Sequence, residues 1–566
     1  MSCMKKKKHY AVRGTAALLA ALTAAVAWGK SAYVPEPRPV KSAVEITALY
    51  YPGTEHMPEW DMVRQTRPEI KPLLGWYDEG DPENIDWQIK WAVEHGISSF
   101  CVDWYWNRGS RRLEHWVKGY YRAKFRRYLK WYMMYANHNQ PGSHSTADQI
   151  AVTRYWLENY FKTPEYYTIG GKPVVVLWQL SRIDEDFIAE AAAKGEKMAK
   201  GEGVKRAFAI SEKMVRDAGL PGICWINMAN AKQRDPKQHA FVQSLGFVGQ
   251  MTYNLGATGP YNMCPEARTP EDSPRHSSFD LMALAAKKIW EVADVYPELP
   301  FWPLLPTGWD DRPRSFQNAC VTYGRTQEKY RILCGEARRF CERRGLKRVV
   351  IAPVNEWQEG SYIEPNEEYG FAMYDAIRDA FCEKPAGGWP KNLSPKDLGR
   401  PLREFPPVIR VAKPVWEFSG TTEGWYRQPY GGGEVECHDG ALTFVINRRH
   451  NFNIRCRPQP FAAEKFRKFS LRMRITPNAR SGLGDVKAPA LRLKWGTEAS
   501  PIISSKCTVD QSRSVASAPV TCDGGWHEYT VDLTANPDWR GKVNELWFEA
   551  ADVLHARVAV DRMKFE

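Results

Sequence analysis

Glu356 and Glu359 are the residues whose chemistry and spacing suit catalysis best in this chain of 566 residues. They lie three positions apart, directly after the apolar segment 348–354, which has the length of a buried β-strand. Two carboxyl groups at a strand end can cut a glycosidic bond, because one donates a proton to the leaving oxygen while the other acts from the sugar's side. The alternative is a solvated first helical turn, where the helix dipole favours glutamate. Spacing alone favours this alternative.

Trp357 stands between the two glutamates. Its ring could form an apolar wall for a sugar. It could also raise the pKa of a neighbouring carboxyl group by removing water from it. Whether the pair can act depends on the elements that position it.

Short apolar segments alternate with amphipathic ones over 44–382. The segments of strand length are 44–51, 98–102, 129–135, 173–177, 222–226, 247–252, 301–305 and 349–354. Helical spacing of apolar residues occurs at 82–95, 113–127, 147–161, 186–197, 203–218, 278–296 and 326–343. Eight strands alternating with helices over about 340 residues predict an α/β fold, a (β/α)8 TIM barrel. An open doubly wound sheet would need a glycine-rich loop where the chain has Tyr50-Tyr51-Pro52-Gly53.

The chain changes character after residue 382. Six prolines spread over 383–412 predict a linker or a strap along the barrel. From 413 to 566, alternating segments of strand length occur at 441–446, 468–475, 490–495, 526–533, 545–550 and 557–565. They predict an all-β sandwich of the jelly-roll type. Such a domain could bind carbohydrate or be purely structural.

Residues 1–27 have the pattern of a cleaved export signal. Five cations precede an apolar run that ends in Ala25-Val26-Ala27, a small-x-small sequence. The run is too short to span a membrane comfortably, so we expect a periplasmic or extracellular protein without stable membrane insertion. Residues 28–43 carry three prolines among charges and predict an extended linker.

Charge and cysteine content exclude several other classes of protein. Removing the five cations of the signal lowers the formal net charge from +13 to +8, and the remaining basic residues are scattered without a nucleic-acid-reading motif. Of the eleven cysteines that remain, four in the C-terminal region could pair after export: Cys437, Cys456, Cys507 and Cys522. The chain has no C-x-x-C spacing and no clustered histidines, which argues against a structural zinc site.

Polar and aromatic residues follow several predicted strands, where a barrel would place them around one site. We expect substrate contacts from Tyr51, Asp103, Trp104, Asn137, Trp178, Tyr253, Asn254, Trp309, Asp310, Arg314 and Trp357. Each has a structural alternative, because Asp103 could cap a helix, Asn137 could stabilise a turn, and a lone ring is usually core. Asp310 could belong to a surface ion-pair cluster. Tyr51 should face the site and Tyr50 should point away, since side chains alternate along a strand.

Six short motifs occur in a fixed order along the chain. They are Tyr50-Tyr51-Pro52, Gly75-Trp76-Tyr77-Asp78, Asp103-Trp104-Tyr105-Trp106, Gly171-Lys172-Pro173-Val174, Pro306-Thr307-Gly308-Trp309-Asp310-Asp311 and Asn355-Glu356-Trp357-Gln358-Glu359-Gly360. In this order the segment 44–380 resembles the glycoside hydrolase family 99-like proteins, including the WbsX-like proteins of polysaccharide gene clusters. The last motif is the most specific. Spacing alone favoured a solvated helical turn for Glu356 and Glu359, but the whole set of motifs favours a catalytic pair.

The resemblance implies that Glu356 and Glu359 carry the reaction. It implies Glu359 as general acid and then general base, and Glu356 as a base on the sugar's 2-hydroxyl, with retention through a 1,2-anhydro intermediate. A nucleophilic Glu356 is the alternative, and the sequence does not choose between these routes. The mannoside specificity of the founding family is not carried over, because no substrate-specific loop matches.

Together these patterns predict a secreted, retaining glycoside hydrolase that acts on a polysaccharide or glycan. No metal or organic cofactor is needed, because two carboxyl groups supply the proton transfer. One alternative is a WbsX-like glycosyltransferase, against which export argues, since nucleotide sugars are cytoplasmic. The other is a non-catalytic glycan-binding protein. The sequence leaves the sugar, the linkage and the oligomeric state open.

Overall fold

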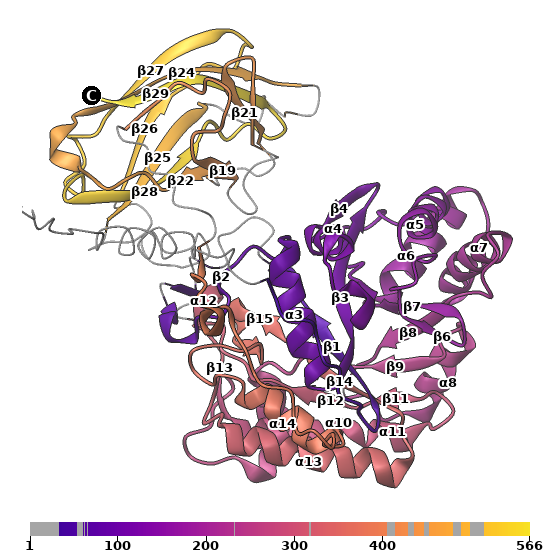
Figure 1. The fold of residues 1–566 in the computed structure, drawn as a ribbon. Helices are drawn as coiled ribbons and strands as arrows, with labels where there is room; N and C mark the ends of the chain where they lie inside the picture. The colour runs from indigo at the N-terminus through magenta and orange to yellow at the C-terminus, as the bar shows by residue number, and fades with distance from the viewer. Residues whose placement is uncertain are drawn as a thin grey trace, which may run out of the picture.

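The computed structural model describes residues 33–53, 60, 63–64, 66–230, 232–315, 318–404, 414–427, 435–446, 452–478, 481, 488–497 and 514–566. The predicted signal 1–27 and residues 28–32 of the predicted linker lie outside the described residues. The described chain forms a barrel of parallel strands followed by two antiparallel sheets (Figure 1). The barrel and the sheets each have their own hydrophobic core.

In the described chain, nine parallel strand segments form the barrel wall, in the order β11-β9-β8-β7-β5-β3-β1-β14-β12. They are β1 (Glu45–Tyr50), β3 (Ile97–Asn107), β5 (Lys130–Tyr135), β7 (Lys172–Leu177), β8 (Cys224–Met228), β9 (Gly249–Met251), β11 (Phe301–Trp302), β12 (Leu304–Pro306) and β14 (Arg348–Ala352). β11 and β12 are halves of one strand interrupted at Pro303; β11 pairs with β9, and β12 pairs with β14. The wall therefore has eight strand positions and is nearly closed, which confirms the predicted (β/α)8 fold.

Helices connect the strands and cover the outside of the barrel (Figure 1). They include α3 (Pro82–Glu94), α4 (His115–Arg122), α5 (Thr146–Asn159), α6 (Leu180–Ala193), α7 (Glu202–Asp217), α8 (Pro236–Ser244), α9 (Thr258–Met263), α10 (Phe279–Trp290), α11 (Val292–Val295), α12 (Arg312–Ser315), α13 (Gln327–Arg344) and α14 (Ala372–Phe381). α3 begins where predicted, because the Asp81 side chain accepts a hydrogen bond from the Glu83 N–H and Pro82 occupies the first position. α4 ends at Arg122, earlier than predicted, and α6 begins at Leu180, before the predicted residue 186.

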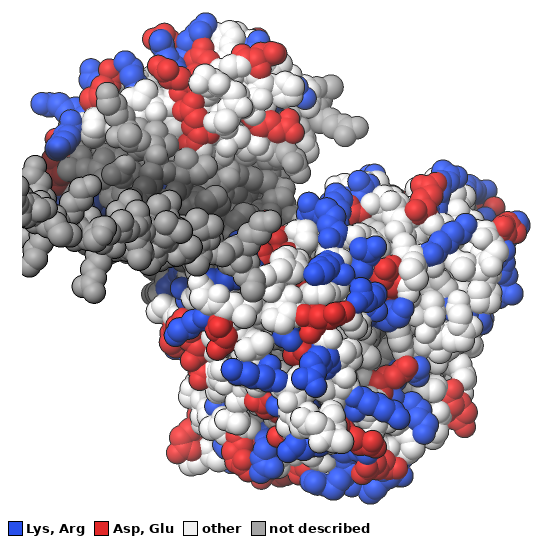
Figure 2. All heavy atoms as spheres, viewed as in Figure 1, with Lys and Arg blue, Asp and Glu red and all other residues white. Residues whose placement is uncertain are grey.

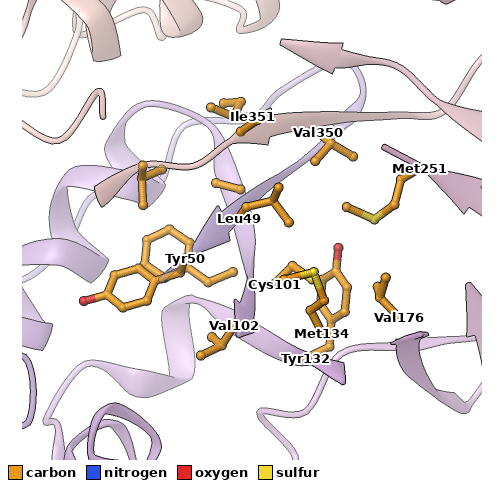
Figure 3. Close-up of a cluster of buried hydrophobic side chains, with 14 of the residues drawn as sticks. Leu49, Tyr50, Cys101, Val102, Tyr132, Met134, Val176, Met251, Val350 and Ile351 are labelled. Carbon is orange, nitrogen blue, oxygen red and sulfur yellow. The ribbon is translucent and has the colours of Figure 1, made fainter. Parts of the chain in front are cut away.

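Alternate side chains of the barrel strands point inward and fill the barrel. Figure 3 shows such side chains gathered between the strands, among them Leu49, Cys101, Met134, Val176 and Met251. Tyr50, directly after Leu49, points the other way and stacks on Phe100, with ring centroids 5.2 Å apart. Because side chains alternate along a strand, each inward row continues at every second residue to the end of its strand. The inward-facing residues that come after the last core residue of each strand therefore gather at one end of the barrel, where the strands finish.

The described parts of the two predicted linkers, 28–43 and 383–412, are hydrogen-bonded to the outside of the barrel. In the described part of the first predicted linker, the Val40 N–H donates a hydrogen bond of 2.9 Å to the Val93 carbonyl. In the second predicted linker, of which 383–404 are described, the Leu393 carbonyl accepts a hydrogen bond of 2.8 Å from the Trp91 indole. Both α3 residues belong to the outer layer of the barrel, so the described parts of both linkers pack against it.

Two antiparallel sheets form the C-terminal part. One has the order β20-β21-β29-β24-β27 with β18 beside β29, and the other has the order β19-β22-β28-β25-β26 with β23 beside β28. The strands are β18 (Val415–Trp416), β19 (Trp425–Arg427), β20 (Glu436–His438), β21 (Ala441–Val445), β22 (Ile454–Cys456), β23 (Phe461–Ala462), β24 (Lys468–Thr476), β25 (Ala490–Thr497), β26 (Val515–Pro519), β27 (Trp526–Asp532), β28 (Lys542–Glu549) and β29 (Arg557–Phe565). Side chains from both sheets, including Trp416 and Trp495, share one core, as the all-β prediction requires.

The ten cysteines that the structure describes are all free. They include Cys437, Cys456 and Cys522, so the pairing considered for these three is not found. Cys456 is buried among apolar side chains of the sandwich core. Cys507 lies outside the described residues.

Charged residues of both signs are interspersed over the face of the barrel shown in Figure 2. This mixture differs from the clustered basic surface that nucleic-acid-binding proteins present. Among the helices in the described ranges, none combines the length and the apolar composition needed to cross a membrane.

Candidate active site

A cavity of about 470 Å³ opens at the end of the barrel where the strands finish. It is lined by Tyr51, Asp103, Tyr105, Arg112, Leu113, Met134, Ala136, His138, Trp178, Tyr253, Asn254, Gly256, Trp309, Arg314, Glu356, Gln358 and Glu359. Most of these residues lie at or beyond the carboxyl ends of the parallel strands, on the face that carries functional groups in such barrels. Both glutamates of the predicted pair therefore lie in one cavity.

Glu356 ends the short strand β15 (Asn355–Glu356), which pairs with β16 (Ser361–Tyr362) just beyond β14. Glu356 is only 7% exposed, and its Oε2 accepts a hydrogen bond of 3.0 Å from the Tyr253 hydroxyl. Burial raises the pKa of Glu356 to about 7, although the Tyr253 hydrogen bond and the charge of Arg314 act in the opposite direction. A carboxyl group with a pKa near neutrality is well suited to exchange protons during catalysis.

Asn355 fixes the backbone beside Glu356. Its Oδ1 accepts a hydrogen bond of 2.9 Å from the Tyr51 N–H, and its Nδ2 donates one of 2.8 Å to the Tyr51 carbonyl. The same Nδ2 donates a hydrogen bond of 2.9 Å to Glu79 Oε1. Asn355 is buried, so moving β15 away from the end of β1 would break several desolvated hydrogen bonds.

Glu359 lies in the 3-10 turn Trp357–Glu359, which follows β15. Its carboxylate forms an ion pair with Arg314, and its backbone carbonyl accepts a hydrogen bond of 2.7 Å from the Asp310 N–H. Gly360 comes next with a φ of +64°, and a Cβ at this position would lie 2.5 Å from the Asp310 nitrogen. Glycine therefore permits the loop after β12 to approach the acid pair closely.

Asp103 adds a third carboxyl group to the cavity. It lies on β3 and is 4% exposed, and its Oδ1 makes no hydrogen bond with any group that the structure describes. Burial and the nearby charge of Glu356 raise the pKa of Asp103 well above its ordinary value. A neutral carboxyl group can both donate a hydrogen bond to a substrate hydroxyl and accept one from it.

Rings and an arginine form the walls of the cavity. Trp178 and Tyr253 meet edge to face, with ring centroids 5.0 Å apart, and His138 lies 5.9 Å from the Trp178 ring. The Arg112 guanidinium lies over Tyr105, 5.6 Å from the ring centroid. Such rings can pack against the apolar faces of a sugar while the polar groups bind its hydroxyls.

Nine predicted site residues line the cavity: Tyr51, Asp103, Trp178, Tyr253, Asn254, Trp309, Arg314, Glu356 and Glu359. Tyr51 faces the cavity, whereas Tyr50 is buried on the other side of the strand. Four predicted residues lie outside the cavity lining: Trp104, Asn137, Asp310 and Trp357.

Trp104 and Asn137 belong to the rows of side chains that point out of the barrel. Trp104 is fully buried and packs against the rings of Trp156 and Tyr160. Asn137 links the segment after β5 to the segment after β7, since its Nδ2 donates a hydrogen bond of 2.8 Å to the Gln179 carbonyl and its Oδ1 accepts one of 2.7 Å from the Gln179 N–H. The prediction that these two side chains face the site is therefore corrected. Asn137 has a structural role, but it joins two distant segments and does not stabilise a local turn.

Asp310 and Trp357 are adjacent to the cavity but turn away from it. Asp310 forms ion pairs with Arg67 and Arg312, so its carboxylate ties the loop after β12 to the rest of the barrel. Trp357 is 3% exposed and stacks on Tyr362 with ring centroids 4.6 Å apart. Trp357 therefore supports the turn from behind instead of forming a wall for the substrate.

Several lining residues were not predicted. Tyr105 lies two residues after Asp103 on β3, so the alternation of side chains could have identified it and excluded Trp104. Arg112 lies on β4 (Ser110–Arg112), a short strand that folds back along β3. No pattern in the sequence marks that hairpin, because β4 is short and polar.

The chain belongs to the WbsX family. The family model, described as Glycosyltransferase WbsX, matches residues 58–377, which is more than half of the chain. This confirms the resemblance inferred from the six motifs. The description of the family names an enzyme that acts on glycans.

Among curated proteins, the uncharacterized protein WxcX of Xanthomonas campestris pv. campestris (strain B100) is 22% identical over 392 residues, which cover 63% of this chain and 52% of the relative. The chain spans about half the length of the curated relatives it matches. A solved glycoside hydrolase-like protein aligns over 62% of this chain and 98% of its own, with 16% identity and a TM-score of 0.44. The GH99 endo-alpha-mannosidase from Bacteroides thetaiotaomicron in complex with Bis-Tris propane aligns over 59% of this chain and 95% of its own, with 17% identity and a TM-score of 0.40.

Proposed function

We propose that this protein is an exported glycoside hydrolase that cleaves a polysaccharide or glycan with retention of anomeric configuration. The observation that carries the proposal is the presence of Glu356 and Glu359 in one open cavity at the carboxyl ends of the barrel strands. Asp103 and the rings around it give the same cavity the means to bind hydroxyl groups and apolar sugar faces.

In the proposed reaction, Glu359 gives a proton to the glycosidic oxygen as its bond to the anomeric carbon breaks. Glu356 removes the proton of the 2-hydroxyl, whose oxygen attacks the anomeric carbon and closes a 1,2-anhydro ring. Water then opens this ring, Glu359 takes a proton from the water, and Glu356 returns its proton to the 2-oxygen. Each displacement inverts the configuration of the anomeric carbon, so the two together retain it. The pKa of Glu356 near 7 supports its role as a base at neutral pH.

In the ligand-free cavity, Arg314 forms an ion pair with the Glu359 carboxylate. For Glu359 to act as the acid, the substrate must displace Arg314, whose side chain is 42% exposed and has room to move. This assignment makes a specific prediction for substrates whose leaving group needs no protonation.

A transferase reaction is the alternative, because the family description names a glycosyltransferase. A transferase would bind an activated donor such as a nucleotide sugar, whose diphosphate is strongly negative. Of the two arginines that line the cavity, Arg314 already pairs with the Glu359 carboxylate and Arg112 lies over the Tyr105 ring. This charge distribution favours a glycan over a diphosphate.

The test compares the protein with its Glu356→Gln and Glu359→Gln variants on a panel of polysaccharides, with new reducing ends as the readout. Each variant should lose roughly a hundredfold or more in rate. Proton NMR of the first product should show the anomer of the substrate. On a dinitrophenyl glycoside, the variant that lacks the general acid should recover most of its first-step rate, and the other should not. Full hydrolysis by both variants would refute the assignment.

Export is part of the proposal and depends on the pattern in residues 1–27. Expression of the whole chain in a bacterium, followed by mass spectrometry of the periplasmic fraction, tests it. The expected product begins at residue 28. An intact N-terminus in the cytoplasmic fraction alone would contradict export without affecting the hydrolase assignment.

A further inference from the structure

The sandwich contains a second cavity of about 470 Å³ that the proposed hydrolase reaction does not use. It is lined by Glu436, His438, Asp439, Ala441, Thr443, Phe444, Val445, Arg474, Thr476, Trp526, Arg557 and Ala559. All of these residues come from β20, β21, β24, β27 and β29, or from the turn between β20 and β21, so the cavity belongs to one sheet. It is a groove on the face of that sheet opposite the sandwich core.

The strand register explains the groove. One row of directly opposed residues crosses the whole sheet, in the order Glu436, Thr443, Ala559, Arg474 and Trp526. Directly opposed residues lie on the same face of a sheet. Ala559 lies on the central strand β29 and has the smallest side chain of the row. Ala559 therefore forms the bottom of the groove, and the larger side chains of Trp526 and Glu436 stand at the two ends of the row.

Two guanidinium groups face this groove, and among the described residues neither has a carboxylate partner. Arg474 lies in the row itself, and Arg557 lies two residues before Ala559 on the same strand. Neither forms an ion pair with any acidic residue in the described ranges. Other arginines of the same sheet are paired, since Arg472 contacts Asp561 at 2.5 Å. The groove therefore keeps two cations available for an external anion.

Trp526 orients one of these cations. The Arg474 guanidinium lies 5.0 Å from the centroid of the Trp526 ring, within range of a cation–π attraction. The Trp526 ring is partly exposed, so it contributes an apolar wall beside the charged groups. Glu436 and Asp439 lie across the groove and can accept hydrogen bonds from hydroxyl groups. A ligand that fits this lining combines hydroxyls, an apolar face and regularly placed anions.

We propose that this groove binds an acidic polysaccharide, in which uronate carboxylates or sulfate esters contact Arg474 and Arg557 while one sugar packs against Trp526. The choice of a sugar polymer over another polyanion rests on the proposed hydrolase function. The site itself rests on the geometry of the sandwich alone. The groove would hold the polymer on the protein while the barrel acts on it.

Affinity electrophoresis of the full chain tests the proposal. The chain carries Glu356→Gln and Glu359→Gln, so that the polymer stays intact, and runs in native gels containing polygalacturonate, chondroitin sulfate or neutral mannan. At least one acidic polymer should retard it, and mannan should not. Trp526→Ala should weaken binding roughly tenfold, Trp526→Phe should preserve most of it, and Arg474→Ala with Arg557→Ala should abolish the retardation. Added salt should weaken binding in parallel.

Arg540→Ala is the matched control, because Arg540 is an exposed arginine of the sandwich outside the groove. It should leave the retardation unchanged, and circular dichroism should show that every variant is folded. Retardation by mannan as strong as by the acidic polymers would overturn the proposal. So would unchanged binding in folded Trp526→Ala and in the double arginine variant. Because the gel uses a chain without catalytic glutamates, its result is independent of whether the barrel hydrolyses any glycan.

Discussion

The Tyr253 hydroxyl donates a hydrogen bond of 3.0 Å to Glu356 Oε2, and this contact joins the end of β9 to the strand that follows β14. The bond stabilises the ionised form of Glu356 and thus opposes the effect of burial on its pKa. Tyr253 is therefore placed to adjust the proton affinity of the proposed base.

Tyr253→Phe should raise the pKa of Glu356 above the value of about 7 that it has with the hydrogen bond. If Glu356 must be ionised to act, the acidic limb of the kcat/KM profile should move to higher pH. The measurement is a pH profile of the variant beside that of the unmodified protein. A shift to lower pH, or none, would count against Glu356 as the base.

Asp103→Asn should retain most activity at neutral pH, because burial and the nearby charge of Glu356 raise the pKa of Asp103 and so favour its uncharged form, and asparagine has nearly the same shape. Asp103→Ala should lower activity at least tenfold, since it removes a buried polar group from the cavity lining. Kinetics of the two variants at pH 7 make the comparison. Equal losses in both would mean that Asp103 acts as a carboxylate.

Trp357→Ala should destabilise the protein by about 3–5 kcal/mol, because Trp357 is a buried ring packed between Trp60 and Tyr362. Denaturant unfolding measures this free energy. The loss should be accompanied by a general fall in activity with little change in KM at temperatures where the variant is folded.

Trp178→Ala provides the contrast, because Trp178 is only partly buried and lines the cavity. It should raise KM several-fold while changing the free energy of unfolding by much less than Trp357→Ala. We place the Trp178 ring in the cavity and the Trp357 ring behind the turn. A rise in KM for Trp357→Ala and none for Trp178→Ala would contradict this placement.

Asn355→Ala should lower kcat at least tenfold and cost about 1–3 kcal/mol of stability, because it removes the three buried hydrogen bonds that Asn355 makes to the Tyr51 backbone and to Glu79. Unfolding and steady-state kinetics on the same preparation test both effects. The Glu356-dependent limb of the pH profile should also move, which a purely structural role would not cause.

The repeating pattern of the sequence was enough to predict the barrel. The eight strands are short, apolar and separated by helical segments, so local composition and connectivity point to the same fold. Which side chains of each strand face the inside of the barrel was harder to predict than the barrel itself. Residue type alone favours the Trp104 ring, whereas the two-residue period of β3 places Asp103 and Tyr105 on the inward face and Trp104 on the outer face.

Other features depend on contacts between distant parts of the chain. Trp357 lies between two catalytic candidates in sequence, but the tight turn that ends at Gly360 directs its ring to Tyr362 and away from the cavity. The hairpin that positions Arg112 is short and polar, and the groove of the sandwich depends on strand register. Neither has a local signature, because register and hairpin pairing are set by tertiary packing.

The absence of a side chain at position 360 limits how the specificity of the proposed enzyme can diversify. The loop after β12 supplies Trp309 and Arg314 to the cavity, and its backbone rests against the place where a Cβ of residue 360 would stand. Variation within the loop can therefore reshape the entrance while the proposed catalytic pair stays fixed. A library aimed at new glycans should randomise that loop but keep Gly360 and Asp310, because a Cβ at position 360 would clash with Asp310 and displace the loop.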